Sequence, residues 1–223
     1  MVLNVYWIAF FTSVVLNLYV TGYVSVVIHE YGHYFFRKLF HVKTCVFIGY
    51  KKYLLKWGDW QFGYSFSPAI GGCNYPDTYL SLGTGWKLFL VISGGGNFNL
   101  IASIPFVMLA YHYFIVHSLL MYINMFIPAA VNVFGFANNL VPLIMYRNNK
   151  GRLKYRFWFD FNNPNLEALS DSYWLLLILI LKIRPGLKSK VDHAVRNAKS
   201  PLLTQLGQQC KYAKIYNGGK GSV

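Results

Sequence analysis

The sequence is short of charge, and above all of acidic charge. Only 13% of its 223 residues are charged, and seven Asp and Glu stand against 21 Lys and Arg. Soluble domains carry about 25% charged residues. Together with a hydrophobic content of 55%, this favours a membrane protein and excludes a disordered chain, a coiled coil and a collagen-like fibre.

Cysteine is also scarce. The three cysteines stand far apart, at Cys45, Cys73 and Cys210. This spacing excludes a disulfide framework and a CxxC metal site, so we interpret them as free thiols.

Basic residues are missing from two long stretches, 1–36 and 88–146. A spanning helix needs roughly 20 apolar residues, and basic loops stay on the cytoplasmic side. We therefore predict a multi-pass integral membrane protein whose chain starts outside, crosses inward by Arg37, turns outside near 111–118 and returns by Arg147. The basic loops and the C-terminus are then cytoplasmic. Because the positive charge follows this topology, we expect no nucleic-acid partner.

The predicted fold is a mainly α membrane protein with a core of three transmembrane helices. The core comprises residues 1–152, with helices at about 12–40, 86–112 and 116–146. The first apolar stretch is too long for one upright span, and Thr21–Gly22 is a candidate weak point in it. The glycine run at 94–96 is expected to permit close helix packing.

Two further segments complete the expected architecture. Residues 41–77 are rich in Val and aromatic residues and predict a small β-hairpin segment at the membrane surface, with Gly58-Asp59 and Gly71-Gly72 as turn signals. Residues 153–223 are expected to form a basic cytoplasmic tail. Within it, the apolar run is too short to span, so we predict a short interfacial or re-entrant helix at 170–184.

One motif carries a specific chemistry. His29, Glu30 and His33 form the pattern His-Glu-x-x-His. Residues four apart on a helix share a face, so both imidazoles can bind one Zn²⁺, and Glu30 can take a proton from a metal-bound water. Glu30 is the only acid in the first 58 residues, and an ionisable residue inside a span is a functional hypothesis by default. The alternative is a His/Glu cluster at a helix end that forms hydrogen bonds only.

From this motif onward the chain resembles the site-2 protease family of intramembrane zinc metalloproteases. After HEYGH at 29–33, SPAIGG at 67–72 is similar to the family's Pro-x-Gly-Gly element. GGNFN at 95–99 is similar to its Gly-Pro-x-x-Asn helix start, with Gly96 in place of Pro, and NLVP at 139–142 resembles its Asn-Leu-x-Pro element. The resemblance extends over about residues 15–152, with the elements in the family's order.

The resemblance implies a zinc-dependent endopeptidase that cuts a transmembrane protein or peptide near the cytoplasmic face. Zn²⁺ is the implied cofactor and Glu30 the general base. Asn99 is expected to position the substrate or stabilise the oxyanion, and Gly71 and Gly72 to contact substrate that adds to the β-rich segment as an extended strand. The implied partners are this substrate, the lipid bilayer and further membrane subunits.

The third zinc ligand departs from the family pattern. The family uses the Asp of an Asp-Gly pair, and the matching place here reads Asn148-Asn149-Lys150-Gly151. The resemblance thus implies Asn149 as a neutral ligand. Asp160 could substitute by folding back, or it is a solvated loop acid. A degraded, inactive site therefore stays open.

Two other function classes compete with the protease. The chain could be a non-catalytic relative that binds transmembrane helices as a chaperone or assembly subunit. It could also be a metal transporter that uses His29 and His33. A transporter predicts carboxylates on the facing helices, and residues 88–146 contain no Asp or Glu, which counts against it.

Overall fold

A computed structural model gives the structure of the chain. It describes residues 2–42, 44, 46–49, 53–63, 71–73, 79, 81–140, 144–147, 153–156, 166–169 and 171–197.

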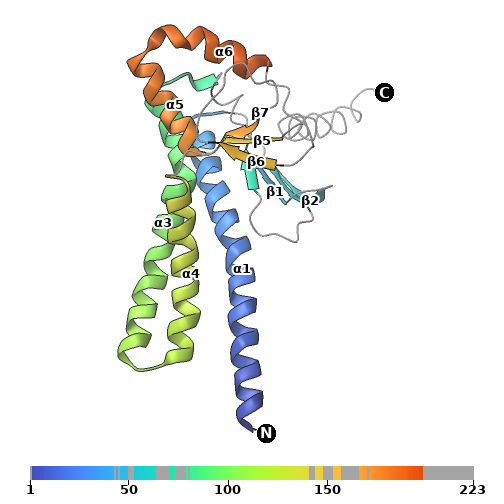
Figure 1. Ribbon diagram of the computed structural model, residues 1–223, viewed down its shortest axis with the longest axis vertical. Coiled ribbons are helices and arrows are strands. Elements are labelled where there is room, and N and C mark those ends of the chain that lie inside the picture. The colour runs from blue at the N-terminus through green and yellow to red at the C-terminus, as the bar shows by residue number, and fades with distance from the viewer. Residues whose placement is uncertain are drawn as a thin grey trace.

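Three long apolar helices dominate the structure (Figure 1). They are α1 (Val2–Leu39), α3 (Trp86–Ile115) and α4 (Leu119–Asn138). Each is long and apolar enough to cross a membrane, as the sequence predicts. The chain is therefore an integral membrane protein with three candidate spans. A short turn joins α3 to α4, and both helices pack against α1.

Helix α1 is unbroken and starts earlier than the sequence suggests. Its 38 residues span about 57 Å at roughly 1.5 Å per residue, against about 30 Å of hydrocarbon. No break occurs at Thr21–Gly22, because no proline interrupts the backbone hydrogen bonds there. Instead, the N-terminal part of α1 extends beyond the turn between α3 and α4 (Figure 1).

The expected helix at 116–146 is too long, since α4 ends at Asn138. The backbone N–H groups of Asn139 and Leu140 donate to carbonyls three residues back, which tightens and closes the last turn. The Asn139 side chain also donates to the carbonyl of Gly135 at 2.8 Å. Pro142 follows in the sequence and disfavours helical backbone in the residue before it. The chain then forms strand β5 (Ile144–Arg147) instead of helix.

The β-rich segment after α1 forms a mixed four-stranded sheet. Its strands, in the spatial order β2-β3-β1-β4, are β2 (Tyr53–Trp57), β3 (Trp60–Gly63), β1 (Val46–Ile48) and β4 (Gly71–Cys73). Strands β2 and β3 are a hairpin around Gly58-Asp59, the turn that the sequence predicts. Gly71 and Gly72, expected in a turn, instead lie in β4, because they pair antiparallel with Ile48 and Phe47 of β1.

This sheet is attached to α1 through β1. Val46 and Ile48 are buried and pack against residues of α1 and of β3, namely Val26, Val27, Tyr34, Trp60 and Phe62. Strand β4 also contacts α1 and ends the order of the described strands. The sheet therefore presents an edge strand beside the helix that carries the His-Glu-x-x-His motif.

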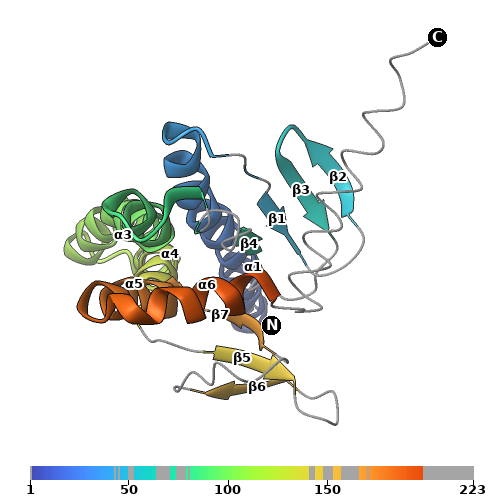
Figure 2. The ribbon, with the colours of Figure 1, turned by 90° about the horizontal axis from the view of Figure 1, so that it is seen from above.

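A second small sheet and two helices follow α4, in a region expected to be mostly tail. Strand β5 pairs with β6 (Leu153–Arg156) and with β7 (Leu166–Leu169), giving the order β6-β5-β7. Helix α5 (Asp171–Ile183) follows β7 and agrees with the short helix expected at 170–184. A 3₁₀ turn (Pro185–Leu187) leads into α6 (Lys188–Asn197). Seen from above, the two sheets form separate groups beside the helices (Figure 2).

Helix α5 is held against α3 by an apolar cluster. Its buried members on the two helices are Leu88, Ile92, Trp174, Leu177, Ile178 and Leu181. Tyr79 and Val191 of α6 complete the cluster, so α3, α5 and α6 share one core. The Tyr79 hydroxyl donates to Asp192 at 2.6 Å, and burial together with this bond raises the pKa of Tyr79.

Close packing of α1 on α3 depends on two glycines. A Cβ atom at Gly94 would lie 2.7 Å from the carbonyl oxygen of Gly32 and 2.7 Å from Cδ2 of Phe36. A Cβ at Gly32 would in turn meet the Gly94 carbonyl. The backbones of the two helices therefore touch at this point, which is the role expected of small residues in membrane helices.

We expect Gly94→Ala to lower the apparent Tm, because α1 and α3 would have to separate; overpacking of this kind costs about 1–3 kcal/mol. Gly96→Ala is the matched control, since its Cβ would meet Phe136 at 3.4 Å, an ordinary contact. Thermal unfolding followed by circular dichroism in detergent micelles compares the two. Equal Tm values for the two variants would contradict the close backbone contact.

Candidate metal centre

Two histidines on α1 form the base of the site. His29 and His33 are one helical turn apart, so their rings share a face. Their Nε2 atoms lie 3.1 Å apart and the ring planes are nearly perpendicular, at 83°. The two Nε2 atoms are thus directed at a common point.

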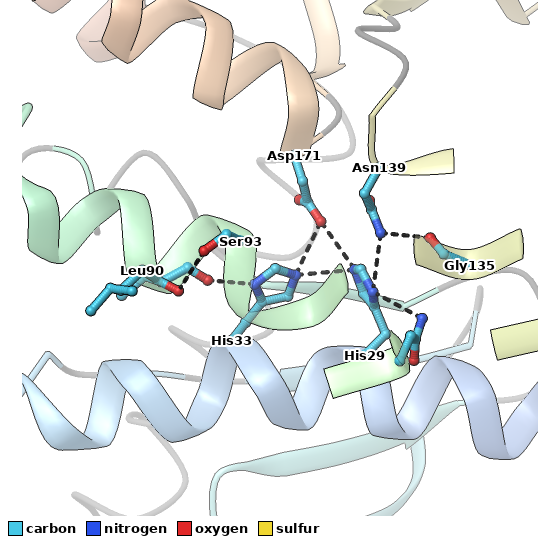
Figure 3. Close-up of polar contacts among 9 residues, drawn as sticks. His29, His33, Leu90, Ser93, Gly135, Asn139 and Asp171 are labelled. Carbon is cyan, nitrogen blue, oxygen red and sulfur yellow. Dashed lines mark hydrogen bonds and ion pairs between the residues drawn. The ribbon is translucent and has the colours of Figure 1, made fainter. Parts of the chain in front are cut away.

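Asp171 brings a carboxylate to the same point. It is the first residue of α5, and its Oδ2 lies 3.0 Å from Nε2 of His29 and 3.1 Å from Nε2 of His33. Figure 3 shows the carboxylate directed from the start of α5 at the two imidazoles. His29, His33 and Asp171 are a group that could hold a metal ion. The sequence reasoning did not single out Asp171, although an acid immediately before an apolar run was a visible signal.

The donor set fits zinc. Ligand atoms of a tetrahedral Zn²⁺, at bond lengths near 2.0–2.1 Å, lie about 3.3–3.4 Å from one another. The three separations here, 3.0, 3.1 and 3.1 Å, are within a few tenths of an ångström of that value. Two imidazoles and one carboxylate leave a fourth tetrahedral position for water or substrate, as catalytic zinc sites require.

Contacts behind the ligands orient both rings. Nδ1 of His33 lies 2.7 Å from the carbonyl oxygen of Val91, to which it donates, so that Nε2 is left as the free lone pair. Nδ1 of His29 lies 3.4 Å from the amide groups of both Asn99 and Asn139. The Asn99 Oδ1 has no hydrogen-bond partner among the described residues, and a half-turn of that amide presents it to His29 Nδ1–H.

The Asp171 carboxyl favours its ionised form. Burial alone would raise its pKa, but the adjacent His33 and His29 outweigh burial and hold the pKa of this carboxyl below its ordinary value. The carboxylate thus offers negative charge and acceptor lone pairs to a cation.

A glycine on α3 leaves room for the site. A Cβ at Gly95 would overlap Nε2 of His33 and would lie 2.6 Å from Cε1 of His29. The backbone of α3 therefore backs directly onto the two rings, and no side chain fits between.

The remaining predicted site residues lie at different distances from this centre. Glu30 follows His29 on α1 and is only 5% exposed. Asn99 is 2% exposed and is brought to His29 by α3. Gly71 and Gly72 lie in β4, which contacts α1. Asn149 and Asp160 lie outside the described residues.

Residues 18–214 match the model of peptidase family M50. The chain belongs to this family. The match confirms the resemblance to site-2 proteases and extends past residue 152, so that it includes Asp171. Neither a curated protein nor a solved structure matches the chain.

Family and geometry together define the protein at a coarse level. It is an M50 family metallopeptidase in the membrane, with a His29/His33/Asp171 cluster consistent with a zinc site. Membership of this family implies membrane-protein substrates.

We expect Asp171→Asn to reduce zinc binding strongly, because it removes the charged ligand shared by both histidines while keeping the side-chain shape. Asn149→Ala should leave zinc content near the wild-type value. Metal analysis of the purified proteins after dialysis gives the comparison. Loss of zinc from Asn149→Ala together with retention in Asp171→Asn would show that the family's Asp position lies at 149 instead.

Proposed function

We propose that the chain is an intramembrane zinc-dependent endopeptidase that cleaves a transmembrane substrate near the cytoplasmic face. The observation that carries the proposal is the meeting of His29, His33 and Asp171 at one largely buried point on the candidate span α1. Buried ionisable groups are costly between membrane helices, and a metal-bound catalytic site accounts for all three.

The proposed roles follow the geometry. His29, His33 and Asp171 would hold the zinc ion, which when bound polarises the scissile carbonyl and acidifies the attacking water. Glu30 takes the proton from that water and then donates it to the leaving amine. Its neighbours support this role, since it adjoins a proposed ligand and is shielded from bulk solvent.

The substrate is proposed to bind as an extended strand. A transmembrane helix shields its own carbonyls, so it must unwind before cleavage. Strand β4 has a free edge among the described strands and contacts α1, which supports strand addition along Gly71 and Gly72. Asn99, buried beside His29, is proposed to hold the substrate carbonyl or the oxyanion.

The proposed depth of the site follows from the helix ends. The His33 ring bonds to the carbonyl of Val91, only four residues from the exposed Lys87 at the start of α3. Lys38 lies in the last turn of α1, on the same side. Since basic residues mark the cytoplasmic boundary, cleavage is proposed in the cytoplasmic half of the bilayer.

Cysteine labelling tests the orientation. In a chain with Cys45, Cys73 and Cys210 replaced by Ala, Ser118→Cys should react with a membrane-impermeant maleimide in intact cells, because it lies in the turn between α3 and α4. Lys56→Cys, in the sheet, should react only after permeabilisation. The reverse pattern would invert the topology.

Glu30→Gln should keep zinc but lower kcat for a transmembrane substrate by roughly 10²–10⁴-fold or more, since proton transfer is lost while the ligands stay. The assay compares cleavage of a co-reconstituted candidate substrate with the zinc content of the same preparation. Asp171→Asn is the companion variant, expected to lose both.

The comparison of wild type with Glu30→Gln separates catalysis from helix binding. Equal amounts of uncut substrate with wild type and Glu30→Gln, despite bound zinc and demonstrable substrate association, would refute the protease and favour a non-catalytic helix-binding relative.

A further inference from the structure

Helix α5 is apolar on two opposite faces. One face is buried against α3 and α6 through Trp174, Leu177, Ile178 and Leu181. On the other side, Leu176, Leu179 and Ile183 form an exposed stripe at helical spacing, and Ile183 is 70% exposed. A helix that is apolar all round belongs in a protein core or in lipid.

The length and attachment of α5 place it in one leaflet. Its 13 residues extend about 20 Å, which is too short for the roughly 30 Å hydrocarbon layer, so α5 can contact one leaflet only. Its first residue, Asp171, is held against α1 by the two histidines. Figure 1 shows α5 leading from there, beside the first turns of α3, to α6 at the end of the molecule opposite to the N-terminus.

Three basic residues lie at or shortly after the end of α5 in the chain. Lys182, Arg184 and Lys190 are all exposed, and none of them has an acidic partner among the described residues. Lys188, by contrast, is paired with Asp192 at 3.2 Å. Trp86 and Lys87, the exposed first residues of α3, are a tryptophan and a lysine of the kind found at membrane interfaces.

We propose that Lys182, Arg184 and Lys190 bind the headgroups of anionic phospholipids, while the exposed stripe of α5 contacts the acyl chains of the same leaflet. The occupant is inferred from charge complementarity, since unpaired cations directly follow a lipid-compatible apolar face. Because α5 carries Asp171, bound lipid also steadies the third metal ligand. This last step rests on the proposed metal site, whereas the lipid binding does not.

Lipid selectivity tests the headgroup site. The full chain is reconstituted in nanodiscs of phosphatidylcholine mixed with phosphatidylglycerol, and the lipids retained are read by native mass spectrometry. Wild type should retain phosphatidylglycerol several-fold over its share. The triple variant Lys182→Gln, Arg184→Gln, Lys190→Gln should lose this selectivity.

A charge-matched control and a competitor sharpen the result. The variant Lys51→Gln, Lys52→Gln, Lys56→Gln removes the same charge from positions 51–56 of the sequence and should retain selectivity. Inorganic phosphate should not displace the retained lipid. Three results would overturn the assignment of Lys182, Arg184 and Lys190 to anionic lipid. They are equal lipid selectivity in both triple variants, no selectivity in wild type, and displacement of the lipid by phosphate.

Zinc release tests the link to Asp171. Transfer of zinc to a chelator should be several-fold slower in discs with phosphatidylglycerol than in phosphatidylcholine alone, and the Lys182/Arg184/Lys190 variant should not show this difference. Neither measurement requires substrate cleavage, so a failure of the proposed peptidase activity does not affect either result. Lipid selectivity with no change in zinc release would refute the steadying role, and absence of zinc in wild type would refute the metal site alone.

Discussion

The contact between one carboxylate oxygen and two imidazoles governs this structure. Asp171 is separated from His29 by 142 residues and from His33 by 138, yet its Oδ2 lies about 3 Å from both rings. An ionised carboxylate placed among apolar helices is costly unless its charge is compensated. Three features of the fold hold this contact in place. The apolar cluster packs α5 against α3, and the glycines allow α1 to approach α3 closely. The sheet β6-β5-β7 leads the chain from α4 to α5.

The His-Glu-x-x-His motif and the three spans could be predicted from the sequence, because each depends on residues that are close together in the chain. The spacing of His29, Glu30 and His33 on a helix fixes their shared face, and the long apolar runs identify three spans. The gap in basic charge from 88 to 146 likewise marks a helical pair with its turn. Each of these features depends only on residues close together in the chain.

Asp171 and the end of α4 could not be predicted in the same way. The match to a family motif directed attention to Asn149, whereas the acid beside the histidines follows the β5–β7 sheet and depends on long-range packing. The helix expected to reach residue 146 ends at Asn138 because side-chain and backbone bonds at Asn139 close it, and apolar periodicity carries no such signal. Gly71 and Gly72 also lie in a strand because β1 pairs with them.

The order of the ligands along the chain has a consequence for biogenesis. A ribosome adds residues at roughly 5–20 per second, so Asp171 is made on the order of ten seconds after the two histidines. Helices α3 and α4 are made within that interval, before the carboxylate exists. The nascent helices can therefore enter the bilayer and pair before the His29/His33/Asp171 cluster can assemble.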